Sequence, residues 1–189
     1  MLRRTWMLTA LATSAVLLGA CTTSTPSSSS PAERRAAIDS GIDATMAQLY
    51  ASVPGSRELA AKSRGILVFP KVYNAGLGIG GEYGEGALRV GGRTADYYKT
   101  TSISFGFQAG AQSKALIMMF MTQDSLDKFR ASNGWTAGAD ASVALLKLGA
   151  NGTIDTSSAN AAVNAFALTN AGLMYAATID GSKVSKLDF

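Results

Sequence analysis

Apolar residues recur every three to four positions along residues 32–53, which is the spacing of one face of an α-helix. The stripe consists of Ile38, Ile42, Met46 (or Thr45), Leu49 and Val53. Pro54-Gly55 ends the pattern. We expect this helix to pack on its own domain, and the alternative is an interfacial helix on a membrane surface. A shorter helix is predicted over residues 57–63, with Ser56 as its N-cap.

The next segments favour β-strands. Residues 66–69 form a buried apolar run that Pro70 bounds. Within the glycine-rich segment 75–90, residues 76–80 alternate glycine with apolar residues. Glycine at every second position clears one face of a strand for close backbone contact. Residues 96–112 alternate again. The apolar run at 114–121 is either a central strand or a short buried helix, and we favour the strand.

A third helix is predicted over residues 123–131, capped by Thr122, with Leu126 and Phe129 facing inward. Further strands are expected within 135–148 and 164–186. Short glycine-rich strands and few helices predict an α+β, mainly β fold. Its core is a compact β-barrel-like sheet with about three surface helices.

The glycine-rich run at 76–86 must also be weighed as a phosphate-binding loop. Such loops lie between a strand and the N-terminus of a helix. Here no helix-forming segment and no Gly-Lys-Ser/Thr follows the glycines. We therefore interpret them as residues that let a sheet curve. We expect Glu82 and Glu85 to accept hydrogen bonds from glycine backbone N–H groups.

The N-terminus has the pattern of an export signal. Arg3 and Arg4 precede an uncharged run, residues 5–20, that is shorter than the ~20 residues needed to span a bilayer. Its end, Leu18-Gly19-Ala20-Cys21, is similar to a bacterial lipobox, in which the cysteine is acylated. We predict a signal peptide over 1–20 and an acylated, palmitate-bearing Cys21. An ordinary signal-peptidase cut that leaves a free thiol is the alternative.

The residues after the cysteine predict a flexible tether over 21–32, because they are Ser, Thr and Pro with no apolar residue to bury. The residue after the cysteine is Thr22 and not Asp. By resemblance to the sorting rules of double-membrane bacteria, this favours the outer membrane. We therefore expect a cell-envelope lipoprotein that faces the periplasm. The remaining domain spans 33–189.

The charge distribution indicates the kind of partner. The chain has 17 Lys and Arg against 13 Asp and Glu, and without Arg3 and Arg4 this becomes 15 against 13. The surplus lies within residues 57–99. Such a basic region suits anionic head groups or nucleic acid, and an export signal argues against nucleic acid. The alternative is an ordinary mixed, solvated surface.

Missing residue types limit the chemistry. The sequence has no histidine, and Cys21 is its single cysteine. This excludes Cys–His and Ser–His–Asp catalysis, disulfides, and zinc sites built on His or Cys. Glu82 and Glu85 are three apart, so on a regular strand they point to opposite faces and cannot act as a glycosidase pair. We expect no enzyme activity, no cofactor and no metal.

Four runs in this order resemble the SYLF domain, also called the Ysc84-like, actin-regulator or lipid-binding domain. They are Gly65–Val72, Ala75–Gly84, Ser104–Ser113 and Gly138–Ser142. The resemblance covers about residues 33–189. It implies a β-barrel-like core with surface helices and binding of anionic lipids, notably phosphoinositides. Eukaryotic members also bind actin, for which an exported lipoprotein has no evident route.

Bacteria generally lack phosphoinositides, so the expected ligand is an anionic phospholipid such as phosphatidylglycerol or cardiolipin. The candidate lipid-binding residues are Lys62, Arg64 and Lys71 beside the first strand, and Arg34 and Arg35 on the first helix. Each contributes ~1 kcal/mol near an anionic surface, which gives weak, salt-sensitive binding. The alternative function is a structural envelope protein that binds another protein or the cell wall through an exposed apolar residue. Trp135 is one candidate for this contact, although a tryptophan is more often a core residue.

Overall fold

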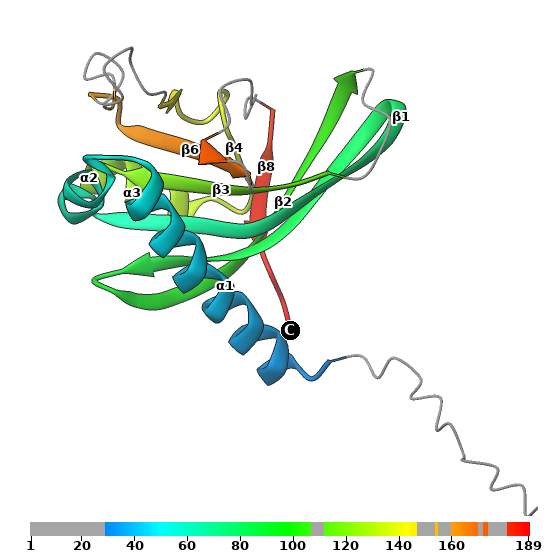
Figure 1. Cartoon of the computed structure of the whole chain (residues 1–189), viewed down its shortest axis with the longest axis horizontal. Helices are drawn as coiled ribbons and strands as arrows, with labels where there is room; N and C mark the ends of the chain where they lie inside the picture. The colour runs from blue at the N-terminus through cyan, green and yellow to red at the C-terminus, as the bar shows by residue number, and fades with distance from the viewer. Residues whose placement is uncertain (1–28, 107–111, 147–153, 155–159, 170–171, 174–180) are drawn as a thin grey trace, which may run out of the picture.

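The computed structural model describes residues 29–106, 112–146, 154, 160–169, 172–173 and 181–189. In this part of the chain three helices surround one curled sheet (Figure 1). The helices are α1 (Pro31–Ser52), α2 (Ser56–Lys62) and α3 (Gln123–Ala131). The strands are β1 (Gly65–Val90), β2 (Arg93–Gly106), β3 (Gln112–Phe120), β4 (Trp135–Thr136), β5 (Val143–Leu145), β6 (Val163–Thr169), β7 (Gly172–Leu173) and β8 (Lys183–Lys186). The prediction of an α+β, mainly β fold is confirmed.

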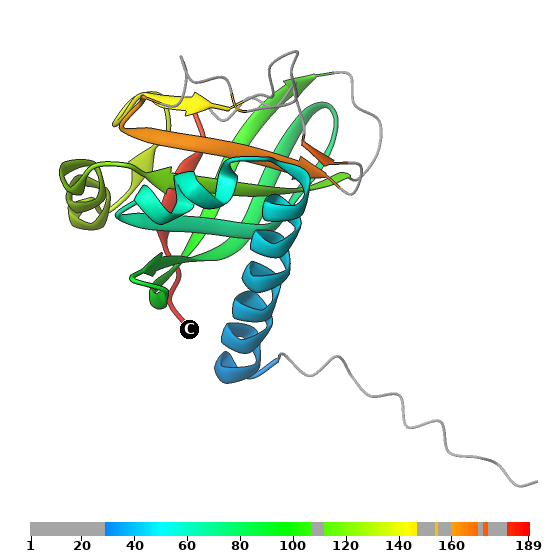
Figure 2. The same ribbon diagram turned by 60° about the vertical axis from the view of Figure 1, so that its left-hand side comes forward.

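The strands follow the order β4-β8-β2-β1-β3-β6-β5, and β7 pairs with β6. Neighbours are antiparallel except β5 and β6, which are parallel. The sheet curls into a half-barrel, and α1 runs along its outside (Figure 2). We call the side packed against α3 the inner face and the side covered by α1 and α2 the outer face.

The long strand β1 holds the half-barrel together. Its first half pairs with β3 and its second half with β2. We predicted that the first strand ends at Pro70, and this is wrong. Pro70 and Lys71 lie in a register irregularity between Phe69 and Val72, where the ladder requires no N–H from proline. The chain therefore passes through Pro70 without leaving the sheet.

Glycines allow the two halves of β1 to touch. A Cβ on Gly84 would lie 2.9 Å from the carbonyl oxygen of Lys71, and a Cβ on Gly86 would overlap the carbonyl oxygen of Val68. No side chain fits at either position without movement of the backbone. The interpretation that glycines curve the sheet is confirmed. Because these glycines lie inside β1, they do not form a phosphate loop before a helix.

The inner face carries an aromatic cluster. Phe129 of α3 lies with its ring centroid 4.8 Å from Phe120 and 5.6 Å from Trp135. Trp135 is only 2% exposed. It is therefore a core residue, which is the more common role of a tryptophan, and the alternative in which it is an exposed docking site is wrong.

The outer face is covered by α1. Ser30 accepts a hydrogen bond from the backbone N–H of Glu33, and the Glu33 carboxylate accepts one from the backbone N–H of Ser30, so a capping box starts the helix. The buried residues of α1 are Ile38, Ile42, Thr45, Met46 and Leu49. They pack against β1, β3 and β6. The prediction that α1 packs on its own domain is confirmed, and its apolar stripe is not available to a membrane.

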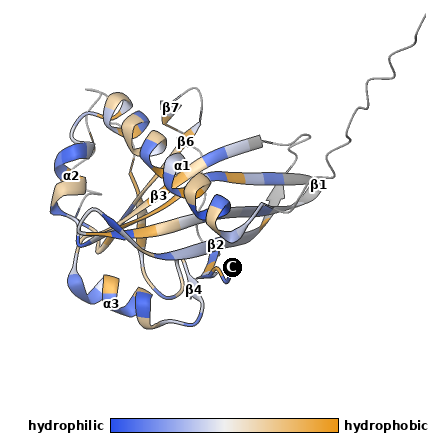
Figure 3. Ribbon diagram, turned by 90° about the horizontal axis from the view of Figure 1, so that it is seen from below, coloured by the Kyte–Doolittle hydropathy of each residue, from blue (hydrophilic) through white to orange (hydrophobic). Residues whose placement is uncertain are grey.

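The shorter helices agree with the prediction, apart from one cap. Gly55, with φ +83°, is the N-cap of α2. Ser56 is buried instead, and its hydroxyl donates to the carbonyl of Val53 at 2.6 Å, joining α2 to the end of α1. Thr122 caps α3 as predicted, accepting from the backbone N–H of Ser125. Orange and blue positions alternate along α3 in Figure 3, as its buried and exposed faces require.

Tyr98 gives a prediction about alkaline stability. Its side chain is buried, and in the described part of the chain its hydroxyl has no hydrogen-bond partner. Burial, with a smaller effect from Asp96, raises the pKa of Tyr98 from 10.0 to about 12. Because the folded-state pKa is raised, titration of Tyr98 leaves the free energy of unfolding unchanged below pH 10 and lowers it as the pH rises from 10 to 12, by up to about 3 kcal/mol.

We expect Tyr98→Phe to remove this loss and to raise the free energy of unfolding at pH 7 by about 1 kcal/mol, because an unpaired buried hydroxyl is removed. Urea denaturation at pH 7 and pH 11 checks both effects. A variant whose stability declines with pH as steeply as that of the wild type would contradict the assignment.

Candidate functional site

A pocket of about 580 Å³ lies among the C-terminal half of α1, α2, the start of β1 and the turn between β1 and β2. Its apolar lining includes Met46, Tyr50, Ala60, Ile66 and Val68. Its charged lining consists of Asp43, Arg57, Arg64 and Arg89. We call this site the arginine pocket. Three cationic groups around an apolar floor suit a ligand with an anionic group on an apolar body.

Two of the arginines have no carboxylate partner among the described residues. The guanidinium of Arg57 lies 4.3 Å from the ring centroid of Tyr50, which places the cation over an aromatic face. Arg64 is exposed, and its backbone N–H donates to the carbonyl of Phe120 at 2.7 Å, which fixes the chain at the start of β1. Both guanidinium groups can therefore bind an anionic ligand without breaking an ion pair.

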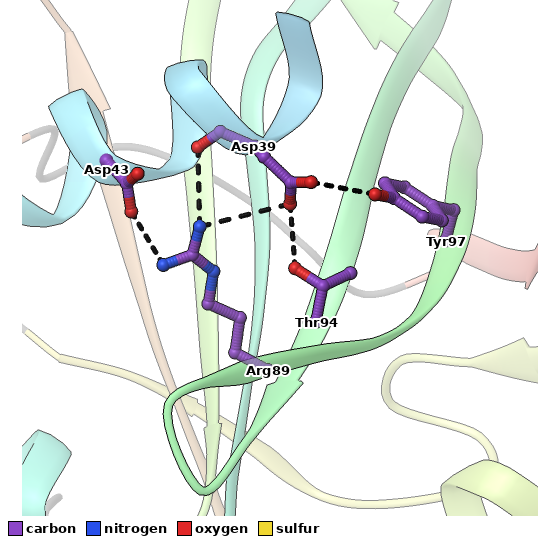
Figure 4. A network of polar contacts seen from close by, with 5 residues as sticks. All are labelled: Asp39, Asp43, Arg89, Thr94 and Tyr97. Carbon is purple, nitrogen blue, oxygen red and sulfur yellow. Dashed lines mark hydrogen bonds and ion pairs between the residues drawn. The ribbon is translucent and has the colours of Figure 1, made fainter. Parts of the chain in front are cut away.

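Arg89 is held by α1 (Figure 4). Its Nη1 lies 2.6 Å from the Asp43 carboxylate, and its Nη2 lies 3.4 Å from the carbonyl oxygen and 3.9 Å from the carboxylate of Asp39. Thr94 and Tyr97 each donate to that carboxylate at 2.7 Å. The Arg89 Nε is buried and has no partner in the described part of the chain. The network docks α1 on the β1–β2 hairpin and leaves one donor of Arg89 without an acceptor.

Residues 101–188 match the model of the Ysc84 family, described as Las17-binding protein actin regulator. The match supports a SYLF domain. It therefore supports a family of lipid-binding or actin-regulator proteins. No curated protein matches the chain. The matched stretch begins within β2 and includes β3 and α3, so the arginine pocket lies in the part of the chain before it.

The structure separates the basic residues predicted to bind lipid. Arg64 lines the arginine pocket. Lys62 is exposed and is the last residue of α2, two positions before Arg64. Lys71 is exposed at the irregularity in β1 and does not line the pocket. Arg34 and Arg35 lie at the opposite end of α1 from the pocket. The fold thus brings together part of the predicted set.

Arg34 and Arg35 are engaged within the domain. Arg34 Nη2 lies 2.6 Å from Oε1 of Glu85. The guanidinium of Arg35 lies 4.5 Å from the ring centroid of Phe189, and that of Arg34 lies 5.2 Å from it. These contacts hold the start of α1 against β1 and the segment after β8.

Two tyrosines donate to carboxylates along this side of the domain. The Tyr83 hydroxyl lies 2.7 Å from Glu85, and the Tyr97 hydroxyl lies 2.7 Å from Asp39. Burial, followed by these hydrogen bonds, raises the pKa of Tyr83 and of Tyr97 above 10.0. Both phenols therefore remain protonated donors near neutral pH.

The sequence did not select Arg57 and Arg89 as site residues. Both belong to the basic region 57–99, so a charge count includes them. Two tertiary contacts set these residues apart from the other basic residues of this region. Arg57 contacts Tyr50 across the break between α1 and α2, and Arg89 forms an ion pair with Asp43 on α1. Neither spacing follows a local periodicity. Only the docking of α1 brings these residues together.

We expected glycine backbone N–H groups to donate hydrogen bonds to Glu82 and Glu85, and this is wrong. Glu82 accepts from Lys114 at 2.9 Å, from Ser102 at 3.1 Å and from Asn74 at 3.2 Å. Glu85 accepts from Arg34 and Tyr83. Among the described residues, side chains supply these hydrogen bonds and glycine N–H groups do not, because the glycines of β1 belong to the ladder.

Among the described residues, no group of three or more His, Cys, Asp or Glu side chains is arranged to hold a metal ion. No described helix has both the length and the apolar composition required to cross a bilayer.

Proposed function

We propose that this chain is a non-enzymatic cell-envelope lipoprotein, anchored through acylated Cys21, whose SYLF domain binds anionic phospholipid head groups. Its place is the outer membrane, on the periplasmic side. The arginine pocket is the observation that supports lipid binding. Arg57 and Arg64 lack carboxylate partners in the described part of the chain, and Arg89 has a buried N–H without an acceptor.

The composition of the pocket favours a lipid over a free anion. A phosphate group pairs with guanidinium groups, and the apolar floor of Met46, Ile66 and Val68 suits the glycerol backbone and first methylene groups of a lipid. Each arginine contributes ~1 kcal/mol near an anionic surface. The affinity is therefore weak, and tethering raises the local concentration enough to compensate.

The anchor and the pocket can reach one bilayer. Helix α1 has 22 residues and is about 33 Å long, and the pocket lies toward its C-terminal end. The ten residues from Cys21 to Ser30 span at most about 36 Å when extended. With α1 lying along the membrane, both ends of the domain can contact lipid.

We expect the mature protein to begin at Cys21, to carry acyl chains there, and to fractionate with the outer membrane. Cys21→Ser is expected to prevent acylation and to release the domain from the membrane fraction. Intact-mass spectrometry of separated membranes measures both. An unacylated Cys21, or a wild-type protein in the soluble fraction, would exclude the anchor.

We expect a soluble version beginning at Thr22 to bind vesicles of phosphatidylglycerol or cardiolipin more tightly than vesicles of phosphatidylcholine. All described elements lie within residues 29–189, so this version retains the fold. Arg57→Gln/Arg64→Gln is expected to weaken binding to anionic vesicles about thirtyfold, since two cationic contacts are lost. Vesicle sedimentation at several salt concentrations gives the partition coefficients.

The matched control is Lys183→Gln/Lys186→Gln, which removes the same charge from exposed positions on β8. It should weaken binding much less than the arginine pair. Equal losses in the two variants would mean that overall charge acts and the pocket does not. Equal binding to neutral and anionic vesicles would reject head-group recognition altogether.

The description of the matched family names Las17 binding and actin regulation. For an exported lipoprotein we propose neither partner. A structural role in binding another envelope protein or the cell wall is the alternative, and cross-linking in whole cells separates it from lipid binding.

A further inference from the structure

Two large apolar side chains lie exposed beside each other on the outer face of the β1–β2 ribbon. Ile103 is 73% exposed and Tyr83 is 44% exposed. Gly81 pairs with Ile103 and Tyr83 pairs with Thr101, so Ile103 and Tyr83 are diagonal neighbours on two adjacent strands. We call them the Tyr83–Ile103 patch.

Both residues belong to the side of the sheet that α1 covers. Tyr83, Glu85 and Ala87 lie on one face of β1, because side chains two residues apart share a face. Ala87 is buried in the core under α1. Ile103 lies on the same face of β2 as Tyr97, whose hydroxyl donates a hydrogen bond to Asp39 of α1. The patch therefore continues the outer face beyond the N-terminal end of α1.

No described residue covers the space between the two side chains. A Cβ placed on Gly81 would have no atom within 4 Å. A single exposed apolar residue is common on protein surfaces and requires no explanation. An exposed isoleucine next to a half-exposed tyrosine, with an open glycine beside them, forms a small exposed apolar patch.

The position of the patch indicates what it contacts. The Tyr83 hydroxyl donates to Glu85, and Glu85 pairs with Arg34 in the first turns of α1. The patch therefore lies beside the start of α1, where the chain leads back through ten residues to Cys21. An anchor at Cys21 keeps this end of the domain within about 36 Å of the bilayer.

We infer that the Tyr83–Ile103 patch inserts into the interfacial layer of the bilayer that carries the anchor. This inference rests on the proposed membrane attachment and adds a contact that does not depend on lipid charge. Ile103 enters the acyl boundary. Tyr83 places its ring beside it with the hydroxyl in the polar layer, as tyrosines do at membrane interfaces. Arg34 remains near the phosphate level.

The test uses the soluble version beginning at Thr22, in which Trp135 is the single tryptophan and is buried. Ile103→Trp adds a second indole at the patch. With phosphatidylglycerol vesicles that contain brominated phospholipid, we expect its fluorescence to shift to the blue and to be quenched. Ala139→Trp, at an exposed position in the turn after β4, is the matched control and should not be quenched.

The second measurement separates the patch from the arginine pocket. Ile103→Asp is expected to lower the partition coefficient about tenfold on anionic vesicles and to lower any residual binding to neutral ones. Arg64→Gln should lower only the binding to anionic vesicles. Because Ile103 is exposed, Ile103→Asp should keep its unfolding midpoint, and circular dichroism checks this.

The outcomes are distinct. If the wild-type domain binds no anionic vesicle, the proposed function fails, and this inference fails with it. If the wild type binds but the introduced indole stays unquenched, only the inference is overturned. If the indole shifts to the blue without vesicles as protein concentration rises, the patch binds a second copy of the chain, which also overturns it.

Discussion

We expect Gly86→Ala to lower the free energy of unfolding by about 3 kcal/mol, because the added methyl group overlaps backbone rather than a movable side chain. The new Cβ would overlap the carbonyl oxygen of Val68 and would lie 2.7 Å from Cδ1 of Phe69. Relief of the overlap requires the two halves of β1 to separate. That movement disturbs the pairing with both β2 and β3, and urea denaturation followed by Trp135 fluorescence measures the loss.

Gly81→Ala is the matched control in the same strand. A Cβ at Gly81 would meet no atom within 4 Å, and the residue is exposed. We expect a change within ~0.5 kcal/mol, since neither packing nor backbone conformation opposes the methyl group. If both variants lose the same stability, the cost arises from strand propensity or the unfolded chain, and close contact within β1 is not the reason for glycine at position 86.

The contrast between these glycines shows what the sequence could and could not predict. Alternation of glycine with apolar residues is local, so it predicted a strand that another backbone approaches. Which glycine makes the contact depends on the bend that brings Val68 opposite Gly86. Pro70 illustrates the same limit, because a proline normally ends a strand. The register irregularity that accommodates it is a property of the pairing with β3.

The helices were predictable because their signals are local. The three-to-four-residue spacing of Ile38, Ile42 and Leu49 identified α1 and its buried side. Thr122 identified the start of α3. Ser56 did not act as a cap, because its hydroxyl found a carbonyl of the preceding helix once the turn brought the two together.

The candidate site was predictable only as a basic region. Residue counting placed a surplus of positive charge in 57–99, and Arg64 of the arginine pocket was selected from it. Arg34 was selected too, yet its carboxylate partner Glu85 lies 51 residues away in the chain. Which arginines are free and which are paired depends on where α1 docks. That information is absent from any short stretch of sequence.

We expect Lys114→Met to lower the free energy of unfolding by about 3 kcal/mol, because it leaves a carboxylate largely buried without its cation. The Lys114 and Glu82 side chains are 13% and 11% exposed, and Nζ lies 2.9 Å from Oε1. Ser102 and Asn74 still donate to Glu82, but neither carries charge. Adding Glu82→Gln should recover more than about 1 kcal/mol, because removal of both charges leaves no uncompensated ion.

The exposed pair of α3 provides the control for this double-mutant cycle. Lys128 lies 2.8 Å from Asp124, and the two side chains are 71% and 74% exposed. Lys128→Met should cost only ~0.3–0.5 kcal/mol, because water solvates the remaining carboxylate. If Lys114→Met costs no more than Lys128→Met, then water reaches Glu82 in solution. The interior of the half-barrel at this end would then be open to solvent, and the ion pair would not help to hold β1 against β3.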